Sequence, residues 1–299
     1  MISADSEVGI ALEHAARIES IRRRFGHCTS SHAFNTLYIW RRFVGGSLHL
    51  EEDLFSLRYK AKGENTWLFP CGDREAAFRF ISGHLEEPDF SLCYLREADV
   101  RWLTERFPGR FRVEETPGDS EYVVSREGHE ILSGKRYEKL RGKVKHAERE
   151  YEIVTERLNE DNTEAALRII HAWRGSRHAE GSLKMYGDEE DTEPLLKQKE
   201  LGITGILMRV NGEPFGVAAG FMLNEDTCDL FLAKECVKDP YLGYYMRREW
   251  MRMLPENVKW VNLEDDLEIE GLRTMKKQMI PEKMNTMWMA VHDEQGAST

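Results

Sequence analysis

Apolar residues recur along this chain with two spacings, and the alternation of these spacings predicts its order of helices and strands. In the first half, the three-and-four spacing of amphipathic helices alternates with short apolar runs typical of strands. Asp73 stands directly before one helical stretch, where it is suited to cap the helix. The pattern predicts helices at about 6–25, 33–43, 74–87 and 97–107, and strands at about 47–51, 53–60, 65–69, 90–95, 111–115 and 121–125.

The second half repeats the alternation and contains a strong hairpin signal. Two apolar runs flank Asn211-Gly212, a pair that favours a tight turn between antiparallel strands. The pattern predicts helices at about 132–149, 162–175, 191–201, 242–254 and 267–278, and strands at about 151–156, 228–234, 258–262 and 284–291, besides the hairpin within 202–223.

The two halves show the same order of elements, although not the same sequence. Each half reads helix, helix, three antiparallel-type strands, helix, strand, helix, strand, an order that resembles the fold of GCN5-related N-acyltransferases (GNAT). The sequence therefore predicts an α+β protein with mixed α/β sheets and two tandem GNAT-like lobes. We expect a first lobe at 1–130, a basic junction helix at 131–150, and a second lobe at 151–299 that carries the active cleft.

Charge is unevenly distributed. The net charge of −11 argues against a generic nucleic-acid binder. Residues 133–149, however, hold seven Lys or Arg against two Glu, a local balance of +5. In the helix expected there, Tyr137, Leu140 and Val144 fall on one apolar stripe, and the bases take the other faces. This surface is suited to tRNA or lipid phosphates, and it also fits a solvated linker helix.

Acids and bases are concentrated near the C-terminus as well. Residues 264–270 hold five acids and residues 273–277 hold three bases. One interpretation is structural: Asp265 or Asp266 caps the next helix, and Asp265 with Glu268 has capping-box spacing. The other interpretation is a charged pocket at a strand end, where open sheets bind ligands.

Two residues of this stretch are candidates for catalysis. Glu264 is suited to act as a general base or to hold a substrate ammonium, and Asn262 ends the strand before it. Arg273 and Lys276 lie three apart on the expected helix and share a face. They are suited to hold a phosphate or carboxylate, or else they are solvated bases near a helix C-terminus.

A possible pyrophosphate loop precedes the helix expected at 242–254. Acyl-CoA enzymes of the GNAT fold place glycine-rich backbone N–H groups against pyrophosphate at a helix start. Here Gly243 is the surviving glycine, Tyr245 replaces a small residue, and Pro240 has no N–H to donate. Gly243 is therefore a candidate cofactor contact, but the loop argues against tight binding of CoA.

Other classes of protein and site find little support. The five cysteines are scattered without a C-x-x-C pair, which argues against a zinc ribbon or a disulfide framework. The nearest approach to a metal cluster is His27-Cys28-Thr-Ser-Ser-His32, whose spacing fits no familiar site. No apolar run approaches the roughly 20 residues of a membrane-spanning helix, and the first residues do not read as a secretory signal. We expect a cytoplasmic protein without a metal, for which peripheral contact with an anionic lipid surface stays open.

Three stretches resemble the C-terminal domain of phosphatidylglycerol lysyltransferase and its soluble relatives. They are "FNTLYIW" (34–40), "LSGKRYEKLRGKVKHAE" (132–148) and "VNLEDDLEIEGLRTMKKQMIPEK" (261–283), of which the last is the most specific. The resemblance covers nearly the whole chain. It implies a tandem acyltransferase fold and a transferase reaction in which an activated aminoacyl or acyl group moves to an amine or a hydroxyl.

The resemblance also implies roles for individual residues. It implies catalytic roles for Glu264 and Asn262. Its substrate-binding positions match Lys135, Arg141, Lys234, Asp266, Arg273 and Lys276. The donor that it implies is aminoacyl-tRNA or another activated acyl compound, and an acyl-CoA-dependent N-acetyltransferase with a small-molecule substrate is the alternative. Ala233 stands where the family pattern has Glu, which favours a third hypothesis, a non-catalytic protein that binds a ligand or a partner.

Overall fold

The computed structural model describes residues 9–179, 189–197 and 199–293, and its contacts divide the chain into two compact units. Unit 1 comprises Met1–Glu121 and Asn285–Thr299, and unit 2 comprises Tyr122–Met284. The chain thus leaves unit 1 once and returns to it near its end. The boundaries expected from the sequence, at residues 130 and 150, both fall within unit 2.

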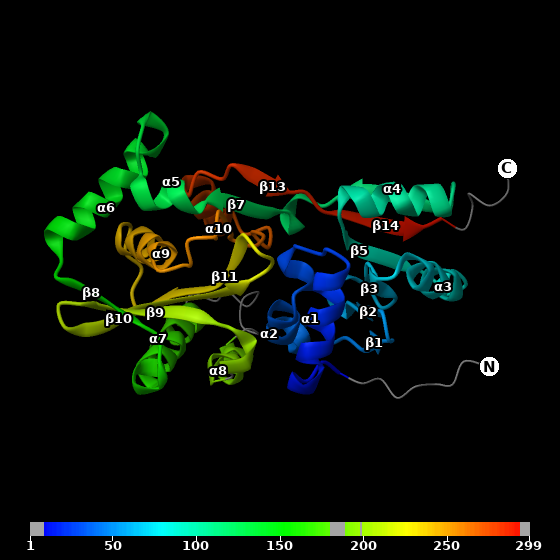
Figure 1. Cartoon of the computed structure of the whole chain (residues 1–299), viewed down its shortest axis with the longest axis horizontal. Helices are drawn as coiled ribbons and strands as arrows, with labels where there is room; N and C mark the ends of the chain where they lie inside the picture. The colour runs from blue at the N-terminus through cyan, green and yellow to red at the C-terminus, as the bar shows by residue number, and fades with distance from the viewer. Residues whose placement is uncertain (1–8, 180–188, 198, 294–299) are drawn as a thin grey trace. The chain divides into compact units, whose positions relative to one another are not determined.

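Unit 1 combines short helices with two small sheets among its described residues (Figure 1). The strand orders are β1-β2-β4 and β3-β5-β14-β6. Its elements are η1 (Leu12–His14), α1 (Ala15–Arg24), η2 (Ser30–His32), α2 (Phe34–Val44), β1 (Leu48–Leu50), β2 (Leu54–Leu57), η3 (Lys60–Lys62), β3 (Thr66–Leu68), β4 (Cys71–Gly72), α3 (Arg74–His84), β5 (Ser91–Leu95), α4 (Glu97–Arg106), β6 (Phe111–Glu115), η4 (Pro117–Asp119) and β14 (Trp288–His292). Residues 6–8 of the helix expected at 6–25 lie outside the described residues, and the rest of that range contains η1 and α1.

Local signals explain several of these elements. The carboxylate of Asp73 accepts hydrogen bonds from the N–H groups of Glu75 and Ala76, each at 3.0 Å, so the predicted cap of α3 is confirmed. The strand expected at 284–291 is in fact two strands. β13 (Lys283–Asn285) joins the sheet of unit 2, whereas β14 pairs with β5 and β6. A single apolar pattern does not reveal that its two ends pair with different sheets.

Unit 2 is built on one seven-stranded sheet of order β13-β7-β12-β11-β10-β9-β8. The β11–β12 pair is parallel and the neighbouring pairs β8–β9, β9–β10, β10–β11 and β12–β7 are antiparallel, so the predicted mixed α/β class is confirmed. Its elements are β7 (Glu121–Ser125), α5 (Arg126–Ile131), η5 (Lys135–Tyr137), α6 (Glu138–Glu150), β8 (Ile153–Arg157), α7 (Glu160–Ala179), α8 (Glu189–Lys197), η7 (Lys199–Leu201), β9 (Thr204–Val210), β10 (Glu213–Met222), β11 (Thr227–Glu235), α9 (Leu242–Arg252), β12 (Trp260–Asn262), α10 (Glu270–Gln278) and β13.

The predicted hairpin joins β9 and β10. Asn211 and Gly212 both have positive φ angles, 50° and 85°, which is the backbone that a two-residue hairpin turn requires. Val210 and Glu213 form the first strand pair beside the turn. The hairpin prediction is therefore confirmed, and it fixes the register of the central strands.

Helices cover both faces of this sheet (Figure 1). On one face α9 packs its apolar side against β9, β10 and β11, with Trp250 fully buried in that core. On the other face α7 packs Ile169 and Ile170 against Leu207 and Leu232. Two hydrophobic layers thus hold the centre of the sheet rigid, which leaves its strand ends to carry chemistry.

The basic helix forms close to its predicted position. η5 and α6 cover residues 135–150, and Tyr137, Leu140, Val144 and Ala147 are buried as the predicted stripe requires. Part of this stripe packs with Tyr244 and Tyr245 of α9. The bases therefore lie on the faces that point away from the apolar contact.

Candidate functional site: an acidic turn at the end of β12

The candidate site of unit 2 begins where two strands part. β11 and β12 run in parallel through three residue pairs, and the last of these is Asp229 with Asn262. β12 ends at Asn262, whereas β11 continues to Glu235. Both Asp229 and Asn262 are fully buried. A parallel strand end is a place where α/β sheets bind ligands, and here it carries polar side chains.

The turn that follows, residues 263–269, is held by its own side chains. The Asn262 Oδ1 atom accepts the N–H of Glu264 at 2.8 Å, and Asp265 and Asp266 accept the N–H groups of Leu267 and Glu268. Glu264, Leu267 and Glu268 have left-handed φ angles of 60°, 50° and 59°. Such a backbone is uncommon for residues other than glycine, and it occurs often at functional sites. We name residues 262–269 the acidic turn.

The expected helix cap at Asp265 or Asp266 is wrong. α10 begins at Glu270, and its N-cap residue, Ile269, makes no side-chain cap. Asp265 and Asp266 bond to N–H groups two residues ahead of themselves, which closes tight turns instead of starting a helix. Capping and turn formation use the same short carboxylate, so the sequence alone does not distinguish them.

Asp266 is the anchor of the acidic turn. It is 1% exposed and accepts hydrogen bonds from Arg273 Nε at 2.9 Å, Arg273 Nη2 at 3.1 Å and the Tyr122 hydroxyl at 2.7 Å. Burial works to raise the pKa of Asp266, but the hydrogen bonds from Arg273, Tyr122 and the Glu268 N–H outweigh burial and leave the pKa lowered. Burial and the Asp266 carboxylate raise the pKa of Tyr122 to about 12. This carboxylate is therefore ionised and committed to holding α10 against β7.

Lys276 brings a second base of α10 into the same place. Its side chain is buried, and its Nζ atom donates to the backbone carbonyl of Asp265. Burial lowers the pKa of Lys276, whereas the nearby carboxylates of Asp265, Glu264 and Asp229, and also Asp266, work to raise it. Arg273 and Lys276 thus share a face, as the spacing predicts, but this face points at the acidic turn instead of at solvent.

Lys234 of β11 contacts an aromatic residue of α7. Its Nζ atom lies 3.6 Å from the ring centroid of Trp173 on α7, and both side chains are buried. The adjacent Ala233 pairs with Ala218 of β10. A buried cation over an indole face is a stable arrangement. The substrate-binding role of Lys234 stays a prediction, as do the roles of Glu264 and Asn262.

The candidate bases of the junction helix differ from one another. Lys135 is exposed, as a phosphate contact requires. Arg141 donates from Nη1 to the carbonyls of Leu132 at 2.6 Å and Gly134 at 3.1 Å, so it closes the turn between α5 and η5. Gly243 lies in the first turn of α9, where a Cβ atom would overlap the carboxylate of Glu235. The glycine therefore makes room for a side chain of this protein.

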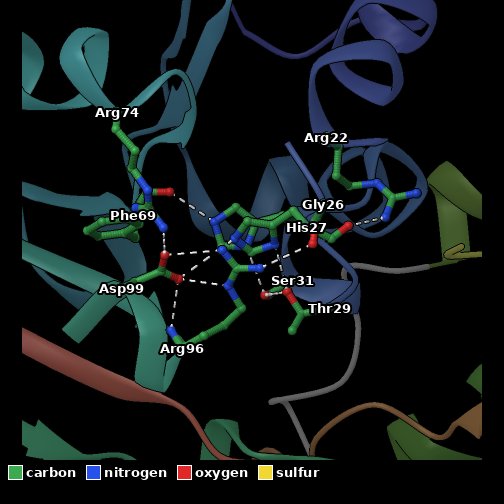
Figure 2. A network of polar contacts seen from close by, with 10 residues as sticks. Arg22, Gly26, His27, Thr29, Ser31, Phe69, Arg74, Arg96 and Asp99 are labelled. Atoms are coloured by element: carbon green, nitrogen blue, oxygen red, sulfur yellow. Dashed lines mark hydrogen bonds and ion pairs between the residues drawn. The ribbon is translucent and has the colours of Figure 1, made fainter. Parts of the chain in front are cut away.

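Unit 1 contains a separate buried polar network, which Figure 2 shows. Asp99 is fully buried and accepts hydrogen bonds from Arg74 Nη2 and Arg96 Nε, each at 2.8 Å. Burial works to raise the pKa of Asp99, but the two guanidinium groups outweigh burial and keep the pKa lowered. The two guanidinium groups of this network thus share one carboxylate.

Two histidines, His27 and His32, complete this network, and Figure 2 labels the first of them. The rings of His27 and His32 lie 3.7 Å apart, and His32 Nε2 donates to the Phe69 carbonyl at 2.9 Å. Burial lowers the pKa of His32 to about 3 and that of His27 well below its ordinary value. Among the described residues, no group of His, Cys, Asp and Glu side chains is arranged to hold a metal ion. The sequence placed these two histidines together only as a weak metal pattern and did not reveal Asp99 as their neighbour.

The two networks have different charge balances. In the acidic turn and its surroundings, Asp229, Glu264, Asp265 and Asp266 exceed the bases Arg273 and Lys276 by two. A partly buried excess of carboxylate favours a cationic group, and a carboxylate at its edge is suited to accept a proton. Tyr122 and Asp229, which sequence reasoning missed, belong to this site. Asp229 is identified by its pairing with Asn262 at the end of β12, and Tyr122 by its hydrogen bond to Asp266. Both contacts become visible only in the three-dimensional structure.

Comparisons with known proteins show similarity in sequence and in fold. The sequence matches the family described as "Phosphatidylglycerol lysyltransferase, C-terminal" over residues 22–291. Similar solved structures include a conserved protein of unknown function from Bacteroides thetaiotaomicron VPI-5482, with TM-score 0.85, 20% identity, and coverage of 96% of this chain and 99% of that one. L-PGS from Bacillus licheniformis follows with TM-score 0.65, 13% identity, and coverage of 93% and 92%.

The structure called FemX is also similar, with TM-score 0.64, 8% identity, and coverage of 96% of this chain and 97% of that one. These likenesses show that the chain shares its mixed α/β fold with those proteins. No curated protein matches the sequence. None of the described helices has the length and apolar character that crossing a membrane requires. Because the family match covers most of its length, the chain belongs to the family of the phosphatidylglycerol lysyltransferase C-terminal domain.

Proposed function

We propose that this chain is an aminoacyltransferase that moves an aminoacyl group from an activated ester, of the aminoacyl-tRNA type, to an amine or hydroxyl acceptor. The observation that carries the proposal is the excess of carboxylates around Lys276 at the end of β12. Membership of the lysyltransferase family and the similarity to L-PGS support a transferase of acyl or aminoacyl groups. The carboxylate excess narrows this class to donors that carry a positive charge.

The positive charge of the proposed donor lies on its α-amino group. An aminoacyl ester carries a free ammonium beside its reactive carbonyl, whereas an acetyl or other simple acyl group carries none. Carboxylates that gather at one place attract such an ammonium, and the partly buried location strengthens the attraction. Asp229 and Asp265 are the residues that we assign to ammonium binding.

Glu264 is the residue that we assign to proton transfer. Asn262 fixes its backbone N–H, and the left-handed φ angle sets the direction of its side chain. As the acceptor's nitrogen or oxygen bonds to the carbonyl carbon, its proton passes to the Glu264 carboxylate. The ester C–O bond then breaks, and the proton returns to the leaving hydroxyl oxygen. No covalent enzyme intermediate is needed, so binding and orientation supply much of the acceleration.

The decisive experiment mixes the purified full chain with tRNA charged with labelled amino acids and with amine or hydroxyl acceptors. We expect Glu264→Gln to lower the rate of transfer by about 100-fold or more, in the range that a general base contributes. Glu268→Gln is the matched control, because Glu268 lies in the same turn with an exposed side chain. Equal loss in both variants, or full activity of Glu264→Gln, contradicts the assignment.

The ammonium hypothesis has its own test. Acetylation of the donor's α-amino group removes the positive charge and leaves the ester intact. We expect about tenfold or greater weakening of donor binding, the value of a lost charge-assisted hydrogen bond. Binding that does not distinguish acetylated from free aminoacyl-tRNA rejects an ammonium site at the acidic turn.

A second candidate function is supported by one residue. Ala233 on β11 stands where the family pattern has Glu, and a methyl group transfers no proton. A non-catalytic protein of this fold would bind aminoacyl-tRNA without consuming it. Saturable binding of charged tRNA, with no transfer and no deacylation above background, would establish that function.

A further inference from the structure

The first turn of α9 has committed nearly all of its backbone donors. The N–H groups of Tyr241 and Leu242 both donate to Asp239 Oδ1 at 2.7 Å. Those of Tyr244 and Tyr245 donate to the Tyr241 carbonyl at 3.2 Å. Pro240, which stands before them, has no N–H. Anions bind at helix starts through N–H groups that lack an internal partner, and those four N–H groups are already engaged.

The Asp239 carboxylate is fixed in this position from two sides. Its Oδ1 atom accepts the two N–H groups, and its Oδ2 atom accepts the hydroxyl of Tyr151 at 3.1 Å. Tyr151 follows α6 directly and is half-buried. The negative charge therefore sits on the helix start itself, where the helix dipole favours it most.

A second carboxylate lies beside the first. Glu235, at the end of β11, occupies the space next to Gly243, and Arg247 Nη1 contacts it at 3.4 Å. Arg247 also donates to the Gly243 carbonyl at 2.8 Å. The nearest guanidinium on this part of α9 is thus held by groups of the protein itself, and an incoming phosphate would meet two carboxylates.

We propose that Asp239 and Glu235 are specificity-determining residues that reject acyl donors bearing a diphosphate, such as CoA thioesters, from the start of α9. The two side chains act together: Asp239 takes the N–H groups that a diphosphate would need, and Glu235 adds repulsion and engages Arg247. This inference rests on the proposed function, which it sharpens by removing one class of donor. An ester donor that does not place a diphosphate at this helix start avoids both carboxylates.

The test measures anion binding and does not require turnover. Isothermal titration at low salt, where charge effects are least screened, follows inorganic pyrophosphate, CoA and acetyl-CoA with the full chain. The variants are Asp239→Gly, Glu235→Gln and the double variant. Glycine is tolerated at helix starts and has no side-chain acceptor, so Asp239→Gly frees the two N–H groups and removes the charge. Glu213→Gln is the control, because Glu213 is an exposed acid beside the hairpin turn.

We expect no saturable binding of the three probes to the wild type or to Glu213→Gln. The double variant should bind pyrophosphate and CoA at least about tenfold more tightly than the wild type, with smaller gains in the single variants. A folded double variant without any gain overturns the proposal, as does micromolar binding of acetyl-CoA by the wild type. If the wild type transfers no aminoacyl group, the proposed function fails while the titration still reports on Asp239 and Glu235.

Discussion

The buried network of unit 1 and the acidic turn of unit 2 contain similar residues but balance their charges differently. In unit 1, Asp99 is paired with Arg74 and Arg96, and burial keeps His27 and His32 uncharged. In unit 2, carboxylates exceed bases around Lys276. The single carboxylate of Asp99 is held by two guanidinium groups, whose remaining positive charge is partly exposed to solvent. A cluster in which carboxylates outnumber bases becomes more stable when a positive charge binds.

The backbone supports the same distinction. The acidic turn contains three non-glycine residues with left-handed φ angles within five positions, Glu264, Leu267 and Glu268. In unit 1, the segment 27–32, which carries both histidines, has no non-glycine residue with a positive φ angle. Strained backbone conformations persist where the surrounding structure holds them in place, and they cluster at sites where they orient a side chain for function. The comparison supports our proposal that the first network has a structural role and the second a chemical one.

Removal of Asp99 should give the largest effect on stability. Asp99→Ala leaves two guanidinium groups without their shared carboxylate, and breaking such a buried pair costs about 3–5 kcal/mol. Urea unfolding, with hydrogen exchange of amides in unit 1, measures the loss. Glu97→Gln is the control, since Glu97 lies in the same helix turn with its side chain 73% exposed. Glu264→Gln should change stability by less than about 1 kcal/mol while it lowers the rate of transfer by about 100-fold or more. If Glu264→Gln destabilised the protein more than Asp99→Ala, the distinction between the two networks would be wrong.

Acidification should lower the stability that the network of unit 1 contributes. His27 and His32 stay neutral in the folded protein, because burial lowers their pKa values, that of His32 to about 3. The unfolded chain binds these protons below pH about 6.5. It therefore holds more protons than the folded chain between about pH 6.5 and 3. The stability that the neutral histidines contribute is complete above this window and is lost as the pH falls through it.

The variant His32→Gln tests this dependence. Glutamine can still donate to the Phe69 carbonyl, but it does not titrate. Between pH 6.5 and 4, the variant should lose stability less steeply than the wild type. The two slopes should differ by up to about 1.4 kcal/mol per pH unit. Urea midpoints across this range measure the slope, with His171→Gln, an exposed residue of α7, as the control. Identical slopes for wild type and His32→Gln would show that this histidine is not held neutral.

Much of the fold could be predicted from local patterns. The Asn211-Gly212 hairpin, the Asp73 cap and the apolar stripe of α6 each depend on residues within one or two turns of chain. The split of the last strand into β13 and β14 could not, because it depends on which sheet each end pairs with. Periodicity identifies a strand but not its partner.

The candidate site shows the same limit. The sequence indicated the acidic turn, but Asp229 and Tyr122 come to it from other strands. Tyr122 and Asp266 lie 144 residues apart in the chain. The start of α10 was misplaced because aspartates that close tight turns have the same composition as aspartates that cap helices. Long-range pairing and the competition between two local uses of one side chain account for these errors.

The smallest effect that we predict concerns the bond between Tyr122 and Asp266. Tyr122→Phe removes one hydrogen bond to a carboxylate that keeps its bonds to Arg273, so the loss should be about 1–2 kcal/mol at pH 7. Urea unfolding measures it. Tyr244→Phe is the control, because the Tyr244 hydroxyl bonds to Gln278 at an exposed position, and a few tenths of a kcal/mol are expected.

The pH dependence of that difference identifies its cause. Asp266 has a lowered pKa in the folded protein, partly through the Tyr122 hydroxyl, so this stabilisation is present above the carboxyl's ordinary pKa of about 3.8. It is lost as the pH falls through the folded-state pKa. The gap between wild type and Tyr122→Phe should therefore shrink in acid. A gap that stays constant would assign the effect to packing of the ring. A gap that shrinks shows that Tyr122 acts on the charge of Asp266, and that β7 therefore helps to hold the acidic turn ionised.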